Sequence, residues 1–145
     1  MNNSDTYERD FYAWATEQAA LLRAGRLSEA DIENIAEEIE SMARGERREM
    51  TNQLIMLTTY LLKWQVQPHQ RSDGWWLIAF EHRSQLAKHL RDNPSLERVL
   101  RDTFATAYRF AVLEMQKQSG LAEEAFPALC PWTAEQVMAN GFMPN

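Results

Sequence analysis

The sequence predicts an all-α fold, an up-down bundle of four main helices with one long central helix. The first indication is an apolar stripe that keeps one helical phase from residue 32 to residue 64. Its members are Ile32, Ile35, Ile39, Met42, Met50, Leu54, Leu57, Leu61 and Trp64. The second indication is the small number of turn-forming residues, five glycines and five prolines in 145 residues. We therefore expect residues 1–145 to form a single helical domain.

The first helix is expected to begin near Asp5 and to end at Gly25, since glycine tolerates the left-handed conformation that closes many helices. Ser28 is expected to cap the next helix, with Asp31 three residues later and an apolar residue on either side. The turn between these two helices is short, which predicts that they run antiparallel.

The second and longest helix has no clear stop before Gln67-Pro68. Gly45 lies in its middle, and the stripe turns polar there at Glu46. Two outcomes are open: a straight helix whose polar middle is exposed to solvent, or a helix with a bend near Gly45. Continuity is favoured, because a break would give no reason to preserve the phase of the stripe across it.

A loop at residues 68–73 leads to a third helix that is expected to end before Asn93. Pro94 suits the first position of a fourth helix, with Asn93 as its cap, and this helix is expected to end near Gly120. An extended apolar segment, residues 126–132, follows and contains two prolines and a tryptophan. A last short helix is expected to begin at the capping-box pattern of residues 133–136.

Five sequence blocks along the chain carry a resemblance to a known family. They are residues 7–14 (YERDFYAW), 37–42 (EEIESM), 61–68 (LLKWQVQP), 94–96 (PSL) and 126–136 (FPALCPWTAEQ). With these blocks, the chain resembles the bacterial family catalogued as domain of unknown function 29, found in cyanobacteria and proteobacteria. The resemblance implies a small all-helical protein and assigns no catalytic residue. The family often has a histidine before the Leu-Leu-Lys-Trp block, where this chain has Tyr60, so no metal or acid–base role is carried over to this position.

The net charge is −6 and unevenly distributed, since residues 1–59 carry 12 acidic and 6 basic groups while residues 60–117 carry 6 and 9. An acidic chain disfavours general binding to nucleic acids or anionic membranes. The longest apolar run, residues 54–62, is too short to span a membrane. The chain has one cysteine, Cys130, and its N-terminus lacks the pattern of a signal peptide, so we expect a cytoplasmic protein.

Three glutamates, Glu33, Glu37 and Glu40, have a spacing that invites a carboxylate metal site. They lie on the helix side away from the apolar stripe, which favours a solvated acidic face. The chain also lacks the Glu-x-x-His pattern of helical di-metal proteins. We therefore expect no metal, no other cofactor and no catalytic residue.

His82, His89 and Tyr60 are the remaining candidates for a ligand site. The two histidines lie on or beside the apolar stripe of the third helix, roughly 10.5 Å apart along its axis, which is too far for one ion. Histidines packed at the margin of the core are the more ordinary interpretation. A site shared with another helix stays open as the alternative.

Two stretches are candidates for an interaction surface. Glu46, Arg47, Arg48 and Glu49 interrupt the apolar stripe of the long helix. Because burying Glu46 alone would cost several kcal/mol, we expect it to be exposed, protonated or paired with an arginine of a neighbouring chain. An acid paired at a two-fold helix crossing would fix the register of a dimer.

The second stretch surrounds the loop after the long helix, where Arg71 and Trp76 are expected at the surface. Arginines beside aromatic residues can contact either a protein or a nucleic-acid strand. Trp64 and Trp75 are expected to point inward by their helical phase, so packing of the core explains most of this region.

The function expected from the sequence is a non-catalytic helical module for protein–protein interaction or oligomerisation. The partner would be a second copy or another bacterial protein, because the apolar stripe is longer than one short chain can cover. The alternative is a regulatory protein that contacts nucleic acid through the basic third and fourth helices. Its candidate contacts are Arg83, Lys88, Arg91, Arg98, Arg101 and Arg109.

Overall fold

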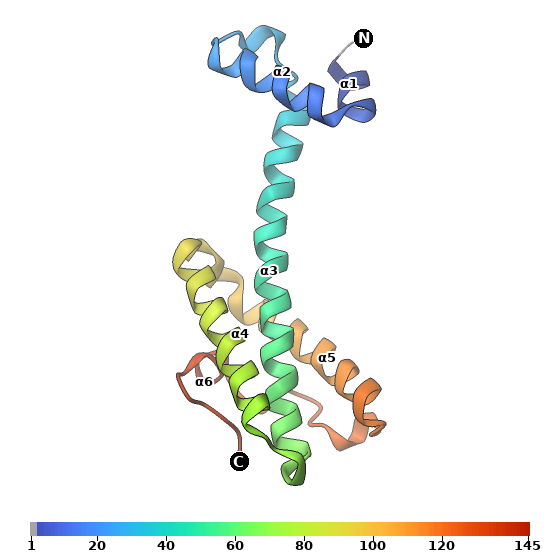
Figure 1. Cartoon of the computed structure of the whole chain (residues 1–145), viewed down its shortest axis with the longest axis vertical. Coiled ribbons are helices and arrows are strands. Elements are labelled where there is room, and N and C mark those ends of the chain that lie inside the picture. The colour runs from blue at the N-terminus through green and yellow to red at the C-terminus, as the bar shows by residue number, and fades with distance from the viewer. Residues whose placement is uncertain (1–2) are drawn as a thin grey trace. The chain divides into compact units, whose positions relative to one another are not determined.

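The computed structural model describes residues 3–145, which form helices joined by short connections and contain no strand (Figure 1). The α-helices are α1 (Asn3–Arg9), α2 (Phe11–Arg23), α3 (Ile32–Val66), α4 (Asp73–Asp92), α5 (Leu100–Ser119) and α6 (Ala134–Met138). The predicted all-α fold class is confirmed. Contacts within the chain form two compact units, Met1–Glu46 and Arg47–Asn145, and each is described by itself. The expectation of a single domain stays a prediction.

The long helix predicted from the apolar stripe is present as α3, which continues through Gly45 without a break. It ends at Val66, one residue before Gln67-Pro68, because proline lacks the backbone N–H that helix continuation requires. Continuity, favoured over a break, is therefore confirmed. Across residues 3–145, no helix combines the length and the apolar character needed to cross a membrane.

In the first unit, the predicted first helix is divided at Asp10. This residue has non-helical backbone angles, and its side chain accepts a hydrogen bond from the Ala13 N–H at 3.0 Å, so it caps α2. The prediction that Ser28 caps the next helix is also wrong. Residues 27–29 form a 3₁₀ turn, and the carboxylate of Asp31 instead accepts the Asn34 N–H at 3.4 Å.

The core of the first unit is small, and Trp14 and Gln18 are its buried residues among the described side chains. The Trp14 indole N–H donates to Asp31 at 3.0 Å, and the Gln18 side chain accepts the Asp31 N–H at 2.7 Å. Tyr7 and Phe11 pack against Trp14 with ring centroids 4.8 and 5.4 Å away. Figure 1 shows α2 crossing the start of α3, so the predicted antiparallel pairing of these two helices is wrong.

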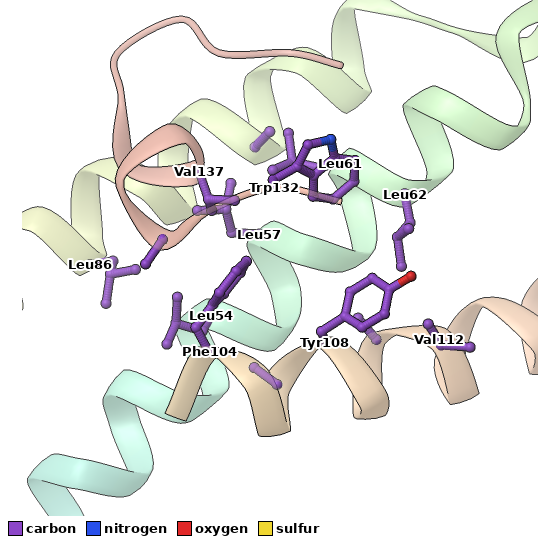
Figure 2. Close-up of a cluster of buried hydrophobic side chains, with 14 of the residues drawn as sticks. Leu54, Leu57, Leu61, Leu62, Leu86, Phe104, Tyr108, Val112, Trp132 and Val137 are labelled. Carbon is purple, nitrogen blue, oxygen red and sulfur yellow. The ribbon is translucent and has the colours of Figure 1, made fainter. Parts of the chain in front are cut away.

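In the second unit, the later turns of α3 pack with α4, α5 and the C-terminal segment around one apolar core (Figure 2). The apolar side chains with no exposed surface are those of Met50, Leu54, Leu57, Leu61, Leu62, Ala79, Leu86, Ala107, Ala111, Met115 and Val137. The members of the predicted stripe from Met50 to Leu61 are thus central to the core. Trp64, at the end of the stripe, is half-buried.

The connection between α4 and α5 differs from the prediction. Residues Pro94–Val99 form a 3₁₀ helix, and α5 begins only at Leu100. The Asn93 side chain donates to the His89 carbonyl oxygen at 3.1 Å, so it closes α4 instead of capping the next helix. Gly120, with φ +74, ends α5 as expected.

The C-terminal segment is fastened to α4 by Arg83. This side chain is buried, and it donates to the carbonyl oxygens of Val137 at 2.8 Å and Phe142 at 2.6 Å. The predicted capping box is present, since Thr133 accepts the Gln136 N–H at 3.1 Å and the Gln136 side chain accepts the Thr133 N–H at 2.9 Å. Burial lowers the pKa of Arg83.

Candidate interaction surface

The first half of α3 presents an uncovered apolar face in the first unit. We call it the open face, and it consists of Ile32, Ala36, Ile39, Met42 and Ala43, all of which are exposed. Ile32 is 52% exposed, Ile39 61% and Met42 71%. At about 100° per residue, Ile32, Ala36, Ile39 and Ala43 lie within an arc of about 60°. Met42 lies about 60° beyond Ile39, so the whole open face spans about 120° of the helix and contains both large and small apolar residues.

The part of the open face around Ile39 stays uncovered because α1 and α2 contact another side of α3. Tyr7 donates its hydroxyl hydrogen to Glu38, and Trp14 donates to Asp31. Both acceptors lie about 90° around the helix from Ile39. The hydrogen bond to Glu38 is the main reason that the pKa of Tyr7 is raised to about 12.

Charged residues lie beside and behind the open face, with Glu33 and Glu40 about 100–120° around the helix from Ile39 and Glu37 about 160°. Glu33, Glu37 and Glu40 are exposed, as predicted, and Arg44 forms an ion pair with Glu37 at 2.8 Å. Both partners of that pair are 54% exposed, so it contributes little to stability. Within residues 3–145, no group of three or more histidine, cysteine or acidic side chains is arranged to hold a metal ion.

The predicted interaction residues Glu46, Arg47, Arg48 and Glu49 are all exposed. Exposure of Glu46 was one of its three expected outcomes, and it removes the desolvation cost of a buried acid. Glu49 accepts a hydrogen bond from the Gln53 amide at 2.9 Å. This stretch of α3 is therefore accessible, whereas its role in binding stays a prediction.

The other predicted surface residues, Arg71 and Trp76, have different surroundings. Arg71 donates to the Trp64 carbonyl oxygen at 2.7 Å, and its guanidinium lies 4.9 Å from the centroid of the Trp64 ring. Arg71 thus closes the turn between α3 and α4. Trp76 is 38% exposed and stacks on Phe80, with centroids 5.5 Å apart and ring planes 9° apart.

The candidates for a ligand site have separate structural contacts. The Nδ1 atom of His82 lies 2.7 Å from the Gln53 side-chain oxygen, and burial lowers the pKa of this histidine. His89 is half-buried two helical turns later on α4. Tyr60 packs against the core, with the Lys63 ammonium 5.4 Å from its ring centroid. Packing at the margin of the core accounts for these positions.

Several basic residues of the predicted nucleic-acid surface already have partners within the chain. Arg83 is buried and bound to backbone carbonyls, so its expected contact with nucleic acid is wrong. Arg101 pairs with Glu135, and Lys88 pairs with Asp92, each at 2.8 Å. The remaining candidates, Arg91, Arg98 and Arg109, are exposed.

Sequence reasoning missed a groove of about 710 Å³ between α5 and residues 123–128. Buried Tyr108 and Phe126 line it together with exposed Phe110 and Leu113. The Tyr108 hydroxyl donates to the Pro127 carbonyl oxygen at 2.6 Å, and burial raises the pKa of Tyr108 to about 12. The useful signal is that Phe110 and Leu113 are apolar yet lie outside the buried face of their helix.

The geometry defines a class, an all-helical protein with an exposed apolar helix face and no metal cluster in its described residues. The chain matches the family described as Domain of unknown function DUF29 over residues 6–143 of its 145. It therefore belongs to that family, which confirms the resemblance seen in the sequence. No curated protein and no solved structure matches the chain.

Proposed function

We propose that the protein is a non-catalytic helical interaction module that binds another protein chain through the open face. The observation that carries this proposal is the exposure of Ile32, Ile39 and Met42 on one side of α3. Large apolar side chains that share one helix face mark a binding site more often than scattered ones do. Binding of a second helix would remove their surface from water.

The small core of the first unit supports the same proposal. Trp14 is its only large apolar side chain that is buried among those described, while Tyr12 and Leu27 are 82% and 59% exposed. Domains of about 60 residues already bury a marginal fraction of their surface, and this unit is shorter. A partner on the open face would add the apolar contacts that this unit lacks.

The nucleic-acid alternative has weaker support. It loses Arg83, which is buried, and Arg101 and Lys88 already form ion pairs within the chain.

We also propose that the module acts in the bacterial cytoplasm. The single thiol, Cys130, is half-buried, and burial raises its pKa, which suits a structural cysteine better than one used for disulfide chemistry.

A photoreactive residue placed at Ile39 tests the proposal in the bacterium that makes the protein. We expect irradiation to produce a covalent adduct with a protein chain, because Ile39 lies at the centre of the open face. Leu77 on α4 is 56% exposed, against 61% for Ile39, so the same residue at position 77 is a matched control. Adducts should form at position 39 in clear excess over position 77.

Substitution of the open face supplies the second readout. Ile39→Gln combined with Met42→Gln should abolish the binding of the partner and leave the helix content unchanged, since both side chains are exposed. Leu77→Gln should leave the binding unchanged. Equal crosslinking at positions 39 and 77, or unchanged binding in the double variant, would contradict the proposed function.

A further inference from the structure

We infer that the chain that covers the open face is a second copy of this protein, with its α3 helix antiparallel to the first. This inference rests on the proposed function and names its partner. Two features of α3 support it, the order of its charges and the presence of both large and small residues on the open face. The dimer would have a two-fold axis that crosses α3 near residues 40 and 41.

Charge changes sign along this part of α3. The acidic residues Glu33, Glu37, Glu38 and Glu40 come first, and the basic residues Arg44, Arg47 and Arg48 follow. In a parallel pair, each residue would face its own copy, so like charges would meet. In an antiparallel pair centred near residue 40, Glu33 of one copy lies opposite Arg47 of the other, since Arg47 lies about 80° around the helix from Ile39. Charge complementarity thus selects the antiparallel arrangement.

The residues of the open face fit the same arrangement. With the axis between residues 40 and 41, Ile39 of one copy meets Met42 and Ala43 of the other copy. The small side chains of Ala36 and Ala43 let the two helix backbones approach closely, while Ile39 fills the space beside them. The same contacts occur twice, because the axis relates the two copies.

The contacts already made inside the first unit leave room for this dimer. Tyr7 and Trp14 bind Glu38 and Asp31, on a side of α3 about 90° from Ile39. A single pair of short helix segments buries less than the roughly 1,200 Å² of a standard stable interface. We therefore expect a reversible dimer that weakens as the salt concentration rises.

Reversal of charge within one chain tests the orientation. Glu33→Arg alone and Arg47→Glu alone should each weaken the dimer by about tenfold in sedimentation equilibrium, because two like-charged contacts replace two attractive ones. The chain that carries both substitutions should recover most of the wild-type association. Glu97→Arg and Arg98→Glu change the net charge equally on exposed residues of the second unit, and they serve as matched controls.

Disulfide trapping supplies an independent readout of the register. In a Cys130→Ser background, chains with Ile39→Cys should crosslink to chains with Met42→Cys more readily than either variant crosslinks to itself. A parallel pair would give the opposite result, with self-crosslinking preferred at both positions. Circular dichroism of each variant confirms that a loss of association does not reflect loss of the fold.

The outcomes separate this inference from the proposed function. A wild-type chain that stays monomeric at high micromolar concentration, or a charge-reversed chain that does not recover, would overturn the antiparallel dimer. If position 39 then still crosslinks to a different protein in cells, the proposed function stands with another partner. If it crosslinks to nothing, both fail.

Discussion

The two halves of α3 have the same apolar spacing and opposite burial. In the first half, Ile39 and Met42 are 61% and 71% exposed. In the second half, Leu54, Leu57 and Leu61 have no exposed surface. Because both halves belong to one continuous helix, the difference comes from what packs on each half. Helical spacing shows that a face is apolar, whereas the rest of the chain decides whether that face becomes core or stays available.

Truncation of one residue in each half gives the largest expected contrast. Leu57→Ala should lower the free energy of unfolding by about 3 kcal/mol, because it leaves a cavity in the core. Ile39→Ala should change it by less than about 0.5 kcal/mol at dilute concentration, since the side chain is exposed. Urea denaturation followed by circular dichroism measures both. Equal losses of unfolding free energy in the two variants would mean that the two halves of α3 do not differ in burial.

The same contrast extends to two arginines. Arg83→Met should cost about 2 to 3 kcal/mol, because the carbonyl oxygens of Val137, which is buried, and Phe142, which is half-buried, lose their donor. Arg44→Met should cost less than about 0.5 kcal/mol, since the Arg44–Glu37 pair is exposed. Denaturation in urea checks the difference.

Limited proteolysis sharpens this test. If Arg83 fastens the C-terminal segment, cleavage after residue 120 should be faster in Arg83→Met than in the wild type or in Arg44→Met. Equal cleavage rates in the three chains would show that the other contacts of the segment, such as buried Trp132 and Val137, hold it without Arg83.

Much of this fold follows from local signals in the sequence. The end of α3 before proline, the end of α5 at Gly120 and the capping box at Thr133 were predicted, because each depends on residues within a few positions. The break at Asp10 was not predicted, since its neighbourhood continues the helical spacing. There the aspartate cap outweighed that spacing.

The sites were harder to predict than the helices, because their surroundings depend on distant parts of the chain. Arg83 has the same sequence character as exposed Arg91, yet it is buried by contact with residues more than fifty positions later. The exposure of Ile39 likewise depends on α1 and α2 packing on another side of α3. Sequence spacing identifies neither partner.

A smaller effect is expected at Tyr108 in the second unit. Tyr108→Phe should cost about 1 kcal/mol near neutral pH, because the hydrogen bond to Pro127 is lost. The pKa of Tyr108 is about 12 in the fold and 10.0 when unperturbed, so folding favours the protonated phenol. Wild-type stability should therefore fall as the pH rises from 10.0 toward 12, and the cost of the substitution should shrink. Tyr12→Phe, at an 82% exposed position, should show no comparable change in alkaline denaturation.

The smallest effect is expected at His82, which reports on the contact between α3 and α4. Burial lowers its pKa from 6.5, so the unfolded chain binds a proton more readily than the fold does. The contribution of His82 to stability is thus complete above pH 6.5 and is lost as the pH falls below this value. His82→Gln should flatten the decline of unfolding free energy in acid, whereas His69→Gln, at an exposed position, should leave it unchanged. If the unfolding free energy of both variants fell with pH as it does in the wild type, the loss of stability in acid would come from groups outside the packed half of α3. The contact of His82 with Gln53 would then contribute little to the stability of the fold.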